Sequence, residues 1–134
     1  MMVDSRNSDS ARRWEPRILL ASDSAHQGGS MRRLLENAGF KVEYAGDYSR
    51  LDGALMRQEF DVILLEVTGE HAVEAAVETA LRVKRANARQ FVGYLADPAL
   101  HSSGLAGDGI FPRSVNRLST VLRGLLAVED RTNS

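Results

Sequence analysis

The stretch from Phe60 to Val67 constrains the fold of this chain more than any other. It is an almost unbroken run of aliphatic and β-branched residues with one carboxylate, Glu66, near its end. An apolar run this short is typical of a strand buried on both faces. Such strands belong to parallel sheets covered by helices, where ligands bind outside the carboxyl ends of the strands. We therefore expect an α/β fold with Glu66 at its functional edge.

A second run of the same form begins at Arg17. It continues through Ile-Leu-Leu-Ala and closes with Ser22 and Asp23. Because the carboxyl ends of parallel strands meet at one edge of the sheet, Asp23 and Glu66 are expected to be neighbours.

Composition limits the classes of function. The 134 residues fit a single domain, and 17 Lys and Arg against 18 Asp and Glu give a net charge of -1, so no overall field attracts nucleic acid or an anionic membrane. The absence of cysteine excludes disulfides, thiolate catalysis and cysteine metal sites. No apolar run approaches the ~20 residues of a membrane span, and the N-terminus lacks the apolar part of a signal peptide. We expect a cytoplasmic protein.

Strand and helix patterns alternate along the chain. Strands are predicted at 17–23, 40–44, 60–67, 90–95 and 109–111, and helices at 30–38, from Ser49 onward, at 70–86 and at 115–128. Ser30 and Gly39 are the expected caps of the first helix, and Gly93 indicates close packing by a neighbour. Asp97 to Gly107 is too rich in Gly, Ser and Pro for more than one helical turn. The strand at 40–44 alternates apolar and charged residues and is expected at the sheet edge.

Five β-α units follow from this order, with a polar tail at 1–15 and another at 129–134. Right-handed crossovers then place helices on both faces of a parallel sheet. In the first tail, Arg12-Arg13-Trp14 is a candidate docking patch, although a charged tail is more often simply solvated.

Residues 16–128 resemble the receiver domains of bacterial response regulators. The resemblance rests on the five units, the helix stop at Gly39-Phe40 and the acid near the end of the third strand. It implies a flavodoxin-like (βα)5 fold of strand order 2-1-3-4-5, here with a shortened fourth helix. It further implies a protein partner in a signalling pathway, no cofactor and no enzymatic activity of the chain itself. A weak homodimer is left open.

Receivers carry two acids after strand 1, a phosphoacceptor Asp after strand 3, a Ser or Thr after strand 4 and a Lys after strand 5. The matching positions here are Ser22 and Asp23, Glu66, Leu95 and Arg113, so only Asp23 fits the family pattern. An aromatic residue three positions before the Lys completes the family's switch, and this chain has Ile110 there.

These replacements predict a receiver that cannot be phosphorylated. Glu66 carries its carboxylate one methylene too far, and a misplacement of ~1 Å costs ~100-fold in rate. Leu95 cannot hydrogen-bond a phosphoryl group. Asp23 and Glu66 could still hold a hydrated Mg²⁺ weakly. The guanidinium of Arg113 suits a standing contact with Glu66, and the alternative is that all three charged residues are merely solvated at loop starts.

Two further regions are candidate sites. The output surface of receivers points to a partner surface at Leu100, Leu105 and Phe111, although these side chains could instead pack inward and close the core. His26 and the glycines after it, which could take cobalamin, FMN or a nucleotide phosphate, support an alternative reading as a small cofactor-binding module. His71 and His101 have no ligand at metal spacing in the sequence.

Overall fold

The apolar run singled out above forms the central strand of a parallel sheet. A computed structural model of the chain describes residues 16–23, 28–97, 100, 108–111, 120 and 122–124. Strand β3 (Val62–Val67) is buried at every position, as a strand covered on both faces must be. It begins two residues later than predicted and extends one residue past Glu66.

Four further strands complete the sheet. They are β1 (Arg17–Ser22), β2 (Lys41–Asp47), β4 (Phe91–Ala96) and β5 (Gly109–Phe111). All neighbouring pairs are parallel, and the order is β2-β1-β3-β4-β5. This confirms the predicted flavodoxin-like order, with β2 at one edge.

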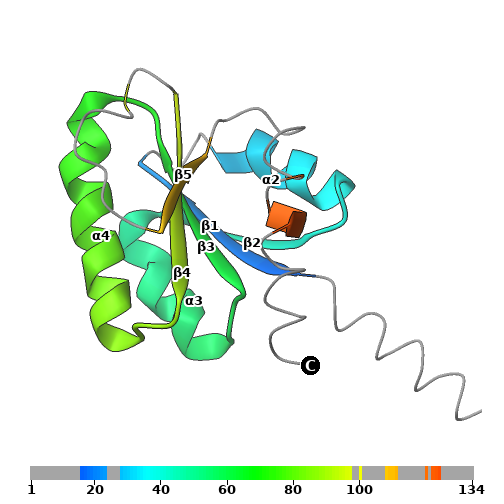
Figure 1. Cartoon of the computed structure of the whole chain (residues 1–134), viewed down its shortest axis with the longest axis horizontal. Coiled ribbons are helices and arrows are strands. Elements are labelled where there is room, and N and C mark those ends of the chain that lie inside the picture. The colour runs from blue at the N-terminus through cyan, green and yellow to red at the C-terminus, as the bar shows by residue number, and fades with distance from the viewer. Residues whose placement is uncertain are drawn as a thin grey trace, which may run out of the picture.

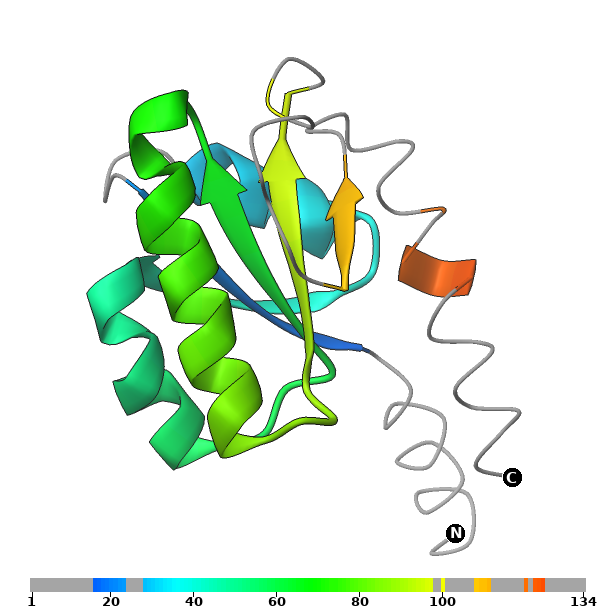
Figure 2. The ribbon, with the colours of Figure 1, turned by 60° about the vertical axis from the view of Figure 1, so that its left-hand side comes forward.

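Helices cover both faces of this sheet. Helices α3 (Leu51–Arg57) and α4 (Val73–Ala86) lie on one face and α2 (Gly28–Asn37) on the other (Figures 1 and 2). The 3₁₀ turns η1 (Tyr48–Arg50) and η2 (Glu70–Ala72) lead into α3 and α4. Between β4 and β5 the described residues include no α-helix, and Leu100 has 3₁₀ geometry, in line with a shortened fourth helix. None of the described helices has the length and apolarity that a membrane span needs.

Two predicted N-caps are wrong. Ser30 is the third residue of α2, which begins at Gly28. Ser49 lies inside η1, where its hydroxyl donates to Asp47 Oδ1 at 2.5 Å, and no side-chain bond caps α3. The chain makes a 3₁₀ turn first, and this turn contains Tyr48, whose side chain is only 8% exposed. Gly39 adopts the left-handed conformation expected of a helix stop, with φ 103°, and Phe40 N donates to Leu35 O at 3.2 Å.

The sheet divides the apolar interior into two cores. One lies under α3 and α4 and the other under α2, where the buried Leu122 joins Met31 and Leu35. The predicted close neighbour of Gly93 is confirmed as the ring of Phe111. A Cβ on Gly93 would lie 2.6 Å from that ring.

The C-terminal helical turn is held to the end of α2. The guanidinium of Arg123 donates to Ala38 O and lies 5.1 Å from the centre of the Phe40 ring. A cation is favoured at this place because the carbonyl end of a helix carries partial negative charge. The rest of the predicted helix at 115–128, apart from Thr120 and 122–124, lies outside the described residues.

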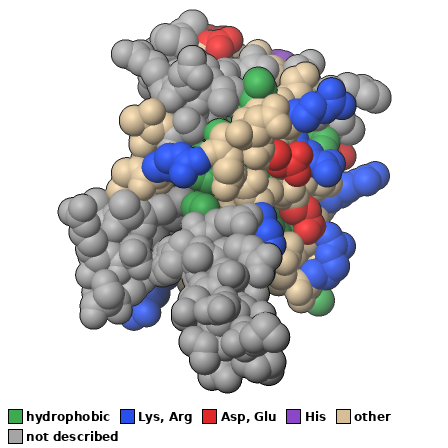
Figure 3. Space-filling view, turned by 90° about the vertical axis from the view of Figure 1, so that its right-hand side faces the viewer, with side chains coloured by type: hydrophobic (Ala, Val, Ile, Leu, Met, Phe, Trp, Pro, Cys, Tyr) green, Lys and Arg blue, Asp and Glu red, His purple; other side chains and the backbone are tan. Residues whose placement is uncertain are grey.

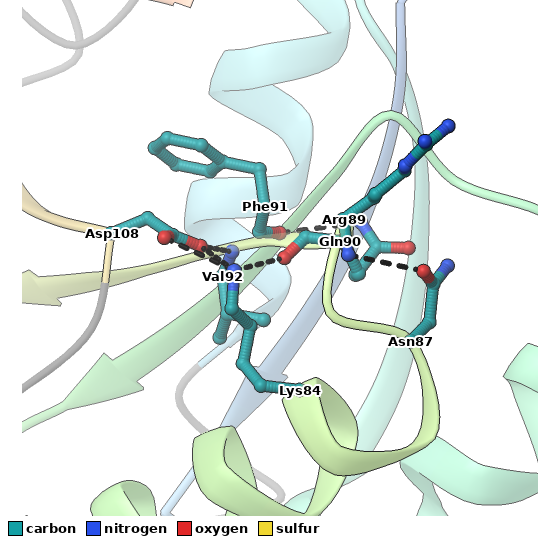
Figure 4. Close-up of polar contacts among 7 residues, drawn as sticks. All are labelled: Lys84, Asn87, Arg89, Gln90, Phe91, Val92 and Asp108. Carbon is teal, nitrogen blue, oxygen red and sulfur yellow. Dashed lines mark hydrogen bonds and ion pairs between the residues drawn. The ribbon is translucent and has the colours of Figure 1, made fainter.

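A polar clamp fixes the start of β5 against β4 and α4. Asp108 Oδ2 accepts from Val92 N at 2.8 Å, and Asp108 N returns a bond to Val92 O at 3.0 Å. Lys84 Nζ, at the end of α4, donates to Asp108 Oδ2 at 2.8 Å and to Gln90 O at 2.9 Å (Figure 4). The carboxylate therefore joins three elements.

This clamp predicts an unequal effect of two Asp→Ala substitutions. Asp108→Ala is expected to lower the free energy of unfolding by about 1–3 kcal/mol, because the Val92 N–H loses its acceptor and Lys84 its counter-ion. The matched control, Asp52→Ala, removes only an exposed 3.5 Å pair with Arg82 and should cost about 0–1 kcal/mol. Urea denaturation of both variants measures the difference, and equal losses would contradict the clamp.

Candidate functional site

One row across the sheet collects the predicted residues. Ser22 pairs with Glu66 across β1 and β3, and Glu66 pairs with Leu95 across β3 and β4. The expectation that the ends of the first and third strands are neighbours is therefore confirmed. Side chains alternate along a strand, so these residues share the α2 face with Leu64, two positions earlier. Glu66 is only 1% exposed on that face.

The backbone carbonyl of Glu66 binds two other segments. Asp23 N donates to it at 3.3 Å, and the hydroxyl of Tyr48 donates to it at 2.7 Å from the buried side. The end of β1 and the turn after β2 are thus both tied to β3 at this residue.

The Asp23 carboxylate is held by hydroxyl and amide donors. Its side chain is 5% exposed. Oδ2 accepts from the Thr68 hydroxyl at 2.5 Å and from Thr68 N at 3.3 Å, and Oδ1 accepts from the Ser22 hydroxyl at 3.3 Å. The exposed imidazole of His71 places Nε2 3.4 Å from Oδ2. Asp23 therefore links the end of β1 to the loop after β3.

Sequence reasoning missed Tyr48, Thr68 and His71 as parts of this site. His71 has no ligand at metal spacing in the sequence, and no pattern singles out Tyr48 or Thr68. The fold brings His71 to Asp23, and Gly69 leaves room for its ring, since a Cβ there would lie 2.7 Å from Nδ1. The one available signal was the Thr-Gly pair directly after β3. Among the described residues, no three His, Asp or Glu side chains gather as a metal site.

The two positions that the resemblance assigns to a switch, Leu95 and Ile110, are apolar and packed. Leu95 is fully buried in the core under α2. Ile110 is partly buried and packs against the core under α3 and α4. Neither side chain can donate or accept a hydrogen bond.

The predicted partner surface has to be corrected. Leu100 and Phe111 are each 7% exposed, and one belongs to each of the two cores. Because each apolar side chain fills space beside the sheet, both pack inward and close the core instead of forming a partner surface. Leu105, Arg113, His26 and His101 lie outside the described residues. The contact between Arg113 and Glu66 therefore stays a prediction.

Two tyrosines next to the row resist ionisation. Burial raises the pKa of Tyr48 well above its usual value, and the carboxylates of Asp23 and Glu66 raise it further. Burial raises the pKa of Tyr94 to about 12, with a further contribution from Asp108. Tyr48 therefore stays a neutral hydrogen-bond donor to the Glu66 carbonyl.

Comparison with solved structures identifies the architecture. A response regulator from Thermotoga maritima matches with a TM-score of 0.66 at 15% identity, over 84% of this chain and 98% of that chain. TrrA from Thermotoga maritima, in complex with Mg²⁺-BeF, matches at 0.63 and 18% identity, over 82% and 98%. A receiver domain protein from Clostridium thermocellum matches at 0.67 and 13%, over 87% and 98%. The chain has the receiver-domain fold.

Comparison of the sequence with known proteins adds no relative to those found by comparison of the structure. No protein-family model matches the chain, and no curated protein matches its sequence. Identities this low establish the architecture, and the chemistry of this receiver-like domain has to be argued from its own residues.

The buried tyrosines predict a loss of stability at alkaline pH. A raised pKa in the folded state means that the unfolded chain releases its tyrosine protons first. The stability that the neutral tyrosines contribute is therefore fully present below pH ~10, the pKa of tyrosine in the unfolded chain. It declines as the pH rises through the pKa values of the folded state. Urea midpoints measured from neutral to strongly alkaline pH should fall less steeply in Tyr48→Phe and Tyr94→Phe. An unchanged slope in both variants would contradict this account.

Proposed function

We propose that this chain is a receiver-like domain that takes no phosphoryl group and acts as a protein-interaction module in bacterial signal transduction. The observation that carries the proposal is the row across the sheet, where the buried Glu66 is flanked by Ser22 and Leu95. In receivers this row supplies an acceptor, a metal ligand and a hydroxyl, as the family resemblance implies. Here only the charge at the acceptor position remains.

The position of Glu66 supports the first half of the proposal. In-line transfer needs a carboxylate held at the donor phosphorus, with a metal ion neutralising the oxygens. The Glu66 side chain is one methylene longer than Asp and only 1% exposed. A phosphodonor would therefore have to reach a group that is displaced and withdrawn from solvent.

The surroundings of Asp23 support it as well. Mg²⁺ prefers carboxylate oxygens in octahedral geometry and usually keeps several waters. Both oxygens of Asp23 already accept hydrogen bonds from Thr68 and Ser22. Ser22 also leaves the row one carboxylate short, so any Mg²⁺ bound by Asp23 and Glu66 would be held weakly.

The apolar switch positions support independence from phosphorylation. A coupled switch needs a polar group that changes partners when the phosphoryl group arrives, so that two states differ in free energy. Leu95 and Ile110 are packed in the two cores and have no such group. The domain accordingly presents one surface to its partner at all times.

A protein partner fits the surface charge better than nucleic acid does. The net charge is -1, and acidic and basic side chains lie intermingled on the face shown in Figure 3. Nucleic-acid binding relies on a basic patch that neutralises phosphates. Interspersed charges instead suit recognition of a folded partner with matching charges.

The test is incubation with a small-molecule phosphodonor and Mg²⁺, followed by intact-mass measurement. We expect no gain of a phosphoryl group, while a receiver that keeps the family's acids, treated in the same tube, is modified. The variant Ser22→Asp, Glu66→Asp, Leu95→Thr, which restores three family residues, should gain mass if the row alone blocks transfer. Stable modification of the unaltered chain at Glu66 or Asp23 would contradict the proposal.

A further inference from the structure

A hollow lies at the amino-terminal ends of the strands, at the opposite end of β3 from Glu66. Its volume is ≈ 430 Å³, and its walls come from the first residues of β1 and β2 and from the ends of α2 and α3. Pockets that hold drug-sized ligands span about 300–1,000 Å³. The hollow is therefore large enough for one aromatic side chain and its neighbours.

The lining combines an apolar floor with a rim of both charges. The apolar part is small: Phe40 and Phe60 are only 3% and 8% exposed, and Val42 is half-buried. Glu36 stands on the rim with 40% of its side chain exposed, and its 3.5 Å pair with Arg32 is an exposed contact of small value. Glu36 is thus available to a second cation.

The N-terminal segment joins the domain at this rim. Lys41 N donates to Pro16 O at 2.9 Å, and both Arg17 and Lys41 line the hollow. Trp14 stands two residues before Pro16, within a reach of about 7 Å along the chain. The segment that precedes β1 is therefore attached to the domain beside the hollow.

We propose that this hollow binds the chain's own residues 1–15. Trp14 covers the apolar floor, and Arg12 and Arg13 lie toward Glu36. Glu15 falls beside Arg17, so the order of charges in the segment complements the rim. Trp and Arg are the residues that most often anchor contacts of this kind.

The covalent connection of residues 1–15 to the domain favours them over a separate partner or a second copy as the occupant of the hollow. A short flexible connection gives an effective concentration of about 1 mM, so docking with a dissociation constant of that size leaves the hollow half occupied. A separate partner or a second copy would need the same concentration in solution. The attached segment therefore has the advantage in a shallow site.

Trp14 supplies the measurement because it is the single tryptophan. Acrylamide quenching of its fluorescence in the whole chain is compared with quenching in a peptide of residues 1–16. Half occupancy predicts a quenching constant about half that of the peptide, with emission shifted to shorter wavelength. Equal quenching in chain and peptide would overturn the proposal.

Charge variants locate the docking site. Glu36→Arg should raise the quenching constant toward the peptide value, whereas Glu78→Arg, the same change at an exposed position of α4 away from the hollow, should leave it unchanged. The double change Arg12→Glu, Arg13→Glu, in the segment that precedes Pro16, should also raise it. Combined with Glu36→Arg, this double change should restore protection.

Two other results would overturn the proposal. Protection that does not respond to Glu36→Arg or to the double change would place Trp14 elsewhere on the domain. Protection that increases with protein concentration would mean that the segment of a second copy occupies the hollow.

Discussion

The backbone carbonyl of Glu66 is the point on which the site depends. It accepts one hydrogen bond from the Asp23 amide and one from the buried Tyr48 hydroxyl. A buried carbonyl left without partners costs about 1–3 kcal/mol. Folding therefore favours the arrangement in which both donors reach this carbonyl. The same contacts set the end of β1 and the turn after β2 against β3. The pairing of β3 with β1 and β4 places Glu66 in one row with Ser22 and Leu95.

The sheet was predictable because its signal is local. Short apolar runs bounded by Gly, Pro and charged residues indicated all five strands, and Glu66 and Asp23 were found because they follow two of those runs. Gly93 was interpreted correctly, since only a close neighbour explains a glycine inside a buried strand. The start of β3 was placed too early because Phe60 is apolar yet precedes the first ladder bond.

The partners of the site were not predictable, because they come from distant parts of the sequence. Tyr48 and His71 reach Glu66 and Asp23 only through the fold, and nothing near them in the sequence marks that contact. Leu100 stands in a stretch whose Gly, Ser and Pro content suggested a loop, yet its side chain fills the core. Propensity reports the backbone of such a stretch and says little about where one apolar side chain packs.

The central claim is that the receiver-like row accepts no phosphoryl group. The most direct measurement is a titration with Mg²⁺ and beryllofluoride, a mimic of a phosphoryl group on a carboxylate, followed by amide NMR spectra. TrrA, a receiver of the same fold, has been captured with Mg²⁺-BeF. For this chain we predict no saturable shifts at Asp23, Glu66 or Thr68. Saturable shifts of these three amides, dependent on both Mg²⁺ and beryllofluoride, would contradict the account.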